Sequence, residues 1–351
     1  MNIRAIIFLF LVLTSVNVFS QSDTIKESYF DKEKAKAKAL AEEESENIPM
    51  DTYLKLVRST DESLREIKIR INLLQKKHKV IEDSLRGCLN QKTEANSEVE
   101  PLNGILVTGK YYALIIGVQD YIDPEINDLD YPINDANELR DVLVNNYTFS
   151  KENVKVLENP DKDKIEEELE ILTEKLSKNQ DDNVLVFFAG HGFYNEVNSK
   201  GYWYASDAKK GSPRSWLSNS IIQDNLMFLS QLAKNVLLIS DACFSGSILK
   251  MRSPFKNNTK TKAIKELYYT KTCKAMTSGA NEPVDDKSKF LEYLVTYLKN
   301  NSKPYLRSRE LHTNIEESVI GESTNYQKPQ FGVVRESNDE GGDFIFIKRS
   351  K

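Results

Sequence analysis

Two stretches, NVLVFFAGHG at residues 183–192 and NVLLISDACFSG at residues 235–246, decide the fold expected for this chain. Each begins with an unbroken apolar run and ends in small and polar residues. Unbroken apolar runs of this length suit strands that are buried on both faces of a parallel sheet. The run YYALIIGV at residues 111–118 has the same character. We therefore expect three central strands at these positions.

Helical patterns separate these runs, and the alternation of strand and helix predicts a mostly parallel, right-handed sheet with helices on both faces. The expected helices cover residues 134–145, 162–178, 222–232, 290–298 and 308–319. Shorter strands are expected at residues 154–157, 273–276 and 343–348, which brings the sheet to six strands. Residues 248–271 are rich in Lys and Asn without a clear period, and we expect an exposed loop there.

Candidate catalytic residues follow two neighbouring strands, at the sheet edge where open parallel sheets bind their ligands. His191 comes directly after the run at 183–189, and Cys243 comes directly after the run at 235–240. Either residue alone is more often structural. Together, in a chain with three cysteines and three histidines, they favour a dyad in which imidazole activates a thiol nucleophile. The backbone N–H groups of Gly192 and Cys243 could then form an oxyanion hole.

The segments AGHG at 189–192 and SDACFSG at 240–246 resemble the His and Cys motifs of the caspase-like cysteine peptidases, peptidase family C14, in the bacterial and metacaspase-type branch. The resemblance covers about residues 111–348. It includes softer matches at NDA 134–136, TSGA 277–280 and GGDF 341–344. It implies a caspase/hemoglobinase-type α/β fold and a cysteine endopeptidase that uses no cofactor.

The resemblance also implies which bond is cut. The metacaspase-like branch receives a basic side chain between two acids, and the matching positions here are Asp135 and Asp241. We therefore expect cleavage after Arg or Lys in a protein or peptide substrate. Asp135 could instead cap the helix that begins near it, and Asp241 could orient a loop. An aspartate-specific protease is disfavoured, because these two acids would repel an acidic side chain.

The basic loop after Cys243 contains Lys250 and Arg252, where an enzyme that prefers basic residues could cut itself. A plain solvated loop is the alternative. Some relatives bind calcium through clustered acids, but WLSNS at 216–220 lacks the acid pair, and Asp207 and Asp224 alone are a weak signal. We expect no metal requirement.

The N-terminus has the pattern of a signal peptide at residues 1–20, with a short positive region, an apolar stretch at 6–13 and small residues before Gln21. A cleaved signal peptide predicts an exported protein, periplasmic or secreted. A membrane anchor formed by an uncleaved N-terminus is the alternative.

Residues 21–104 are expected to form a charged helical region and a linker, followed by the peptidase domain at 105–351. Within residues 50–88 apolar positions recur at alternating steps of three and four, which is typical of a coiled coil and predicts a homo-oligomer. Packing of this helix on its own domain is the alternative. Cys88 lies on the seam, where a parallel dimer could form an interchain disulfide.

Two other kinds of function stay open. One is a catalytically silent protein that keeps the fold and assembles partners through its coiled coil; the other is a different acyl-transfer enzyme on the same dyad. The net charge of −5 gives no sign of a nucleic-acid partner, and no phosphate-binding glycine loop is present in the sequence.

Overall fold

The computed structural model describes residues 107, 109–176, 180–195, 200–242, 249–250, 261–279, 287–324 and 327–349. The expected signal peptide and coiled coil lie outside these residues, as does Cys88. Within the described ranges, no helix combines the length and the apolar character that crossing a membrane requires.

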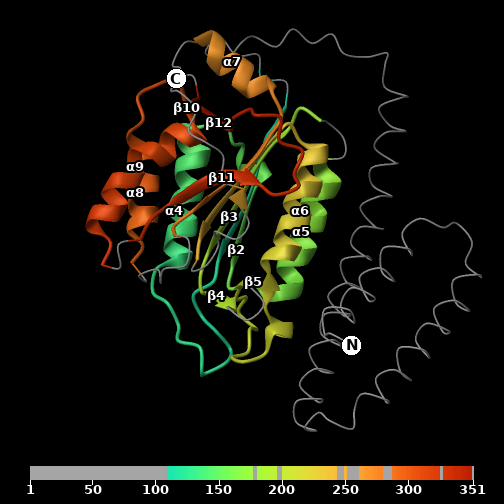
Figure 1. Ribbon diagram of the computed structural model, residues 1–351, viewed down its shortest axis with the longest axis vertical. Helices are drawn as coiled ribbons and strands as arrows, with labels where there is room; N and C mark the ends of the chain where they lie inside the picture. Colours follow the sequence, from blue (N-terminus) through green and yellow to red (C-terminus); the bar gives the residue numbers. More distant parts are fainter. Residues whose placement is uncertain are drawn as a thin grey trace, which may run out of the picture. The chain divides into compact units, whose positions relative to one another are not determined.

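In the described part of the chain, a seven-stranded sheet lies between two layers of helices (Figure 1). Its strand order is β2 (Val154–Glu158), β1 (Tyr111–Gly117), β3 (Asn183–Ala189), β7 (Asn235–Asp241), β9 (Thr272–Thr277), β11 (Gln330–Val334) and β8 (Leu249–Lys250). The first five of these strands are parallel, and β11 and β8 pair in the antiparallel sense. The expected α/β fold class is confirmed.

Three details of the expected fold are wrong. The sheet has seven strands instead of six, because β11 and the two-residue β8 extend it and the expected last strand does not join it. That strand, β12 (Ile345–Ile347), pairs with β10 (Tyr305–Arg307) in a separate two-stranded sheet. Part of the expected loop at 248–271 is helix α7 (Thr261–Tyr269), whose buried residues Ile264 and Tyr268 lie one turn apart. Nine residues are too few to establish a helical period in the sequence.

The helices divide between the two faces of the sheet (Figure 1). Helices α5 (Lys162–Leu176) and α6 (Asn219–Leu232) cover one face. Helices α4 (Pro132–Asn146), α8 (Lys289–Asn300) and α9 (Ser308–Glu322) cover the other. Short 3-10 turns lie at Lys151–Asn153 and Pro213–Ser215.

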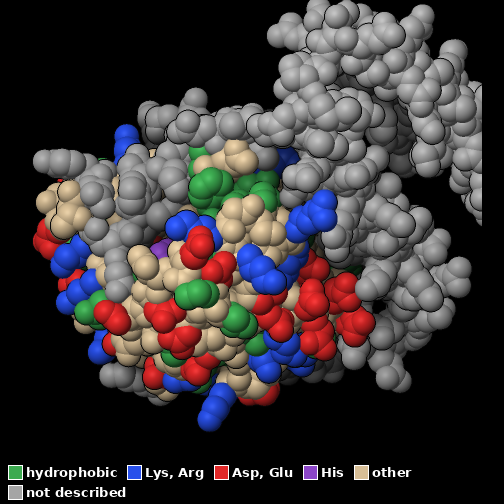
Figure 2. Space-filling view, turned by 90° about the horizontal axis from the view of Figure 1, so that it is seen from below, with side chains coloured by type: hydrophobic (Ala, Val, Ile, Leu, Met, Phe, Trp, Pro, Cys, Tyr) green, Lys and Arg blue, Asp and Glu red, His purple; other side chains and the backbone are tan. Residues whose placement is uncertain are grey.

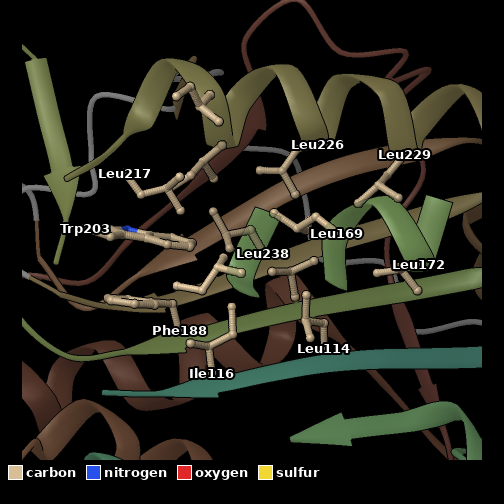
Figure 3. Packing of buried hydrophobic residues seen from close by; sticks show 14 of the residues in the cluster. Leu114, Ile116, Leu169, Leu172, Phe188, Trp203, Leu217, Leu226, Leu229 and Leu238 are labelled. Atoms are coloured by element: carbon tan, nitrogen blue, oxygen red, sulfur yellow. The ribbon is translucent and has the colours of Figure 1, made fainter. Parts of the chain in front are cut away.

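Side chains along β1 point alternately into the two cores. Leu114 and Ile116 point into the core beneath α5 and α6, whereas Ala113 and Ile115 point into the core beneath α4. Both faces of β1 are therefore buried, which is why its sequence is apolar throughout. Figure 3 shows the first core, where leucines of α5 and α6 meet the strand residues.

A second, three-stranded sheet follows β3 and consists of β4 (Gly192–Asn195), β5 (Lys200–Trp203) and β6 (Leu217–Ser218). Trp203 inserts from β5 into the first core, where its ring stacks on Phe188 with 4.2 Å between centroids and 6° between planes (Figure 3). Phe188 is the sixth residue of β3. This stack therefore fixes the small sheet to the strand that leads to His191.

A buried ion pair fixes the segment before β12 to the central sheet. Lys274 of β9 donates to Asp339 Oδ2 at 2.9 Å and to the carbonyl oxygen of Gly342 at 2.6 Å. The side chains of Lys274 and Asp339 are 4% and 1% exposed, so the pair is removed from water. Cys273 is buried beside it, as expected for a core residue, and burial raises the pKa of its thiol to about 12.

Lys274→Ala removes the cationic partner of the buried Asp339 carboxylate. We expect the free energy of unfolding to fall by roughly 3–5 kcal/mol, because a buried charge left without its counter-charge is costly. Urea denaturation measures the loss. Lys289→Ala, which removes an exposed pair with Glu292, serves as the control and should leave the urea midpoint near that of the wild type. Equal losses in the two variants would contradict the assignment.

Candidate active site

His191 lies two residues beyond the end of β3, at the carboxyl edge of the sheet. β3 and β7 are parallel and end together, with Ala189 opposite Asp241, and the Gly190 N–H donates to the Asp241 carbonyl oxygen at 3.3 Å. Cys243 is two residues past Asp241 in the chain and lies outside the described residues. The two strands therefore end in register, and in the sequence each member of the expected dyad follows the last residue of its strand by two positions.

Tyr121 holds the backbone of His191. Its hydroxyl accepts a hydrogen bond from the His191 N–H at 2.8 Å and donates to the Val118 carbonyl oxygen at 3.3 Å. Its ring also packs against the imidazole, with 5.1 Å between centroids. Because Tyr121 is itself buried, it positions the histidine from the side of β1. Sequence analysis missed this residue, although its place just after the first strand was a usable signal.

The backbone of Asn127 sets the chemistry of the imidazole. Its carbonyl oxygen lies 2.9 Å from His191 Nε2. A carbonyl oxygen can only accept, so Nε2 must carry the hydrogen, and in the neutral ring Nδ1 is then unprotonated. Nδ1 is therefore the nitrogen that can accept a proton from a thiol. A backbone carbonyl leaves no mark in the sequence, so this contact could not be predicted.

The loop that carries Tyr121 and Asn127 is braced by the end of β2. Asn159 follows β2 and adopts φ 48°, a left-handed conformation that Asn tolerates better than most residues. Its Oδ1 accepts from the Gln119 and Asp120 N–H groups at 2.7 and 3.0 Å. The loop is thus tied to the neighbouring strand end, which limits the movement of the groups that hold His191.

Glycines flank His191 for two different reasons. A Cβ at Gly190, where φ is 155°, would lie 3.1 Å from both the Tyr121 hydroxyl and the Val118 carbonyl oxygen. At Gly192 the requirement concerns the N–H. The Tyr204 N–H donates to the His191 carbonyl oxygen at 3.0 Å, so the next pair along, Gly192 with Trp203, is a non-hydrogen-bonded pair. The Gly192 N–H accordingly points away from β5 and takes no part in the pairing of β4 with β5.

Asp241 is the last residue of β7 and is 6% exposed. Burial raises the pKa of its carboxyl group to about 6, against the smaller opposing effects of the Ser288 and Ser278 hydroxyls. Ser288 is also the N-cap of α8. Within the described residues, Asp241 Oδ1 has no hydrogen-bond partner. A buried carboxylate with an open acceptor suits a basic ligand group.

Asp135 lies at the same edge of the sheet, on the face covered by α4 and α8. It is the fourth residue of α4, and the helix begins at Pro132 with Tyr131 at the N-cap, so the alternative of a helix cap at Asp135 is wrong. The start of α4 packs closely on the end of β1, since a Cβ at Gly117 would lie 2.7 Å from the Pro132 carbonyl oxygen. Asp241 therefore ends β7, and Asp135 lies in the first turn of the helix that packs on the end of β1.

The remaining candidate residues lie elsewhere or fall outside the described ranges. The Lys250 backbone belongs to β8 and pairs with Val333, while its side chain and Arg252 are not described. Asp207 accepts from the Lys162 N–H at the start of α5 at 2.9 Å, and Asp224 is buried on α6. The described part of the chain contains no group of three or more His, Cys, Asp or Glu placed to hold a metal ion.

Comparisons with known proteins identify the family. The sequence model of the caspase-domain family, Peptidase_C14, matches residues 110–336, so this chain belongs to the caspase-domain family. A crystal structure from Geobacter sulfurreducens matches with 17% identity and a TM-score of 0.44, covering 64% of this chain and 93% of that one. Caspase-1 from Spodoptera frugiperda matches with 14% identity and a TM-score of 0.45, covering 71% and 97%. The comparison with curated proteins finds no match.

Tyr121→Phe removes the acceptor of the His191 N–H while keeping the ring against the imidazole. We expect the His191 Nε2–H tautomer to lose population, because the ring no longer has a fixed distance to the Asn127 carbonyl. NMR of protein labelled with 15N-histidine measures the tautomer, and His191→Ala assigns the signal among the three histidines.

Tyr111→Phe is the matched control, since it removes another buried hydroxyl, which donates to the Ile345 carbonyl oxygen at 2.8 Å. Both variants should lose about 1 kcal/mol of stability. Only Tyr121→Phe should change the His191 signals, and unchanged signals in that variant would refute its positioning role.

Proposed function

We propose that this caspase-domain protein is a cysteine endopeptidase in which Cys243 is the nucleophile and His191 the base. The observation that carries the proposal is the alignment of His191, held by Tyr121 and Asn127, at the end of a strand in register with the one that leads to Cys243. Family membership supports the peptidase fold. The position of the imidazole supports its use in catalysis.

The reaction proceeds by acyl transfer to the thiol. His191 Nδ1 takes the Cys243 proton, and the sulfur attacks the peptide carbonyl carbon. The Gly192 and Cys243 N–H groups bind the resulting oxyanion. The C–N bond breaks as His191 returns the proton to the leaving amine. Water then attacks the thioester, with His191 again as base, and releases the acid and the free thiol.

We further propose that the enzyme cleaves after Arg or Lys. Asp241 offers a carboxylate with an open acceptor at this edge, and Asp135 lies at the start of α4 on the same side. A guanidinium or ammonium group in contact with Asp241 would favour its ionised form and lower its raised pKa. An acidic side chain would meet like charge in a dry site, which disfavours it.

Turnover of matched fluorogenic peptides that end in Arg, Lys or Asp tests both proposals. We expect the kcat/KM for the basic peptides to exceed that for the Asp peptide by about 100-fold or more, since opposite charges pair strongly out of water. Cys243→Ala should abolish all turnover. Cleavage only after Asp would refute the acidic pocket, and activity that persists in Cys243→Ala would refute the nucleophile.

Asp241→Asn separates the role of the carboxylate in substrate binding from the stability that its burial costs the folded protein. Because burial raises its pKa to about 6, the folded protein binds a proton between roughly pH 4 and 6 that the unfolded chain releases. Stability therefore falls as the pH rises through this window, and above it the ionised group costs roughly 2–3 kcal/mol.

Asp241→Asn should consequently be more stable than the wild type at about pH 7.5 and nearly equal to it at about pH 3.5, below the pKa of the unfolded chain, as measured by denaturant unfolding. Its kcat/KM for Arg and Lys peptides should fall by about 100-fold, because the amide carries no charge. Equal stabilities at both pH values, or an intact preference for basic peptides, would contradict the assignment.

Three further proposals rest on sequence patterns. We propose that the enzyme is exported through its N-terminal signal peptide and associates with itself through residues 50–88. We also propose that it cuts itself after Lys250 or Arg252, which the fragment patterns of the wild type and Cys243→Ala test directly. Cleavage after Lys250 would require its pair with Val333 to open.

A further inference from the structure

We propose that the small sheet beside His191 carries a second specificity site, formed by Phe193, Tyr204 and Trp216. This site binds an aromatic or large aliphatic side chain of the substrate on the leaving-group side of the scissile bond. The proposal rests on the peptidase function proposed above and extends it to the residues that follow the bond.

The three aromatic residues lie on the same face of the small sheet as His191. Side chains two residues apart on a strand share a face, which places Phe193 with His191. Tyr204 pairs with His191 through its N–H, so it belongs to that face as well. The Trp216 ring lies 5.0 Å from the Phe193 ring and 4.9 Å from the Tyr204 ring, between centroids. The three rings therefore form one continuous surface next to the catalytic base.

The position of this surface is fixed from behind. Trp203 and Leu217, on the opposite face, belong to the first core, where Trp203 stacks on Phe188 (Figure 3), and Trp216 belongs to the same core. In addition, the Trp216 Nε1–H donates to the Lys209 carbonyl oxygen at 2.9 Å. A ligand that contacts the aromatic surface would therefore meet an ordered face, and binding would cost little conformational entropy.

Exposure distinguishes the part of the surface that a ligand can reach. Trp216 is 4% exposed, and its ring packs against those of Phe193 and Tyr204. Phe193 is 37% exposed, and Tyr204 is half-buried. Phe193 is thus the accessible ring of the cluster. Its neighbours are rings, and the site offers stacking and apolar contact as its main interactions.

The chemistry of the dyad decides which side of the scissile bond this surface serves. His191 must reach the nitrogen of the leaving amine to return the proton, so the imidazole lies on the leaving-group side. Phe193 is two residues farther along the strand, about 7 Å away at 3.3–3.4 Å per residue. An extended peptide has the same rise, so the first or second residue after the bond can place its side chain on Phe193.

Charged side chains of both signs lie on this side of the molecule. Figure 2 shows the side at which β4 and β5 lie in Figure 1; acidic, basic and hydrophobic side chains are mixed over most of it, and acidic side chains gather at one edge. Local contact with the rings should therefore determine which residue is preferred after the scissile bond.

Internally quenched peptides test the proposal when they keep Arg before the bond and vary the next residue among Phe, Leu, Ala and Asp. For the wild type we expect the kcat/KM of the Phe peptide to exceed that of the Ala peptide by about tenfold. In Phe193→Ala this ratio should fall to about one, and in Phe193→Leu it should be intermediate. Tyr269→Ala is the matched control, because Tyr269 is 42% exposed on α7, at the other end of the domain from β4 (Figure 1). It should keep both the ratio and the activity.

A binding measurement separates this proposal from the proposed catalysis. In the Cys243→Ala background the same peptides stay intact, and fluorescence anisotropy gives their dissociation constants. We expect about tenfold tighter binding of the Phe peptide, lost in Cys243→Ala/Phe193→Ala. Binding preference without turnover in the wild type would refute the peptidase and leave this site standing. A Phe/Ala ratio near one in the otherwise unchanged protein, or a ratio that Phe193→Ala preserves, would overturn it.

Discussion

The parallel pairing of β3 with β7 is the constraint on which the site depends. The two strands run side by side from Asn183 and Asn235 and end together at Ala189 and Asp241. A slip of one residue would turn every side chain of a strand to the other face and exchange the contents of the two cores. Because both cores are filled by large apolar side chains, the register is strongly specified. The same register determines where His191, which follows β3, lies relative to the end of β7.

The sequence predicted the elements whose burial leaves a plain pattern. The strands at 111–118 and 183–189 are apolar on both faces, and the structure places them within a residue of the expected bounds. β11 was missed because it follows a polar stretch and contains only three consecutive apolar or small residues after Phe331. The small sheet was missed for a related reason. Its strands are short, and its aromatic residues face two different environments, so no single period emerges.

The sequence indicated the candidate side chains of the site but not the groups that hold them in place. His191 and Asp241 lie at the ends of β3 and β7, Asp135 lies in the first turn of α4, and Cys243 falls outside the described residues, so the roles expected for them stay predictions. The groups that orient His191 are the Tyr121 hydroxyl and the Asn127 carbonyl oxygen. The first acts on a backbone N–H, and the second is part of the backbone itself. The Asn127 contact leaves no residue pattern, because any residue supplies a carbonyl oxygen, whereas the place of Tyr121 just after β1 was a usable signal.

Because Trp203 stacks on Phe188, the two faces of the small sheet have different surroundings. The face that carries Trp203 packs in the first core and fixes the path of β4, the strand after His191. On the other face Trp216 also packs in this core, whereas Phe193 is 37% exposed, so Phe193 is the side chain that can change with the least effect on the core. Under the proposed function, a change at Phe193 would alter which substrates are preferred and leave His191 in place, so related proteins could differ in their targets while sharing one reaction.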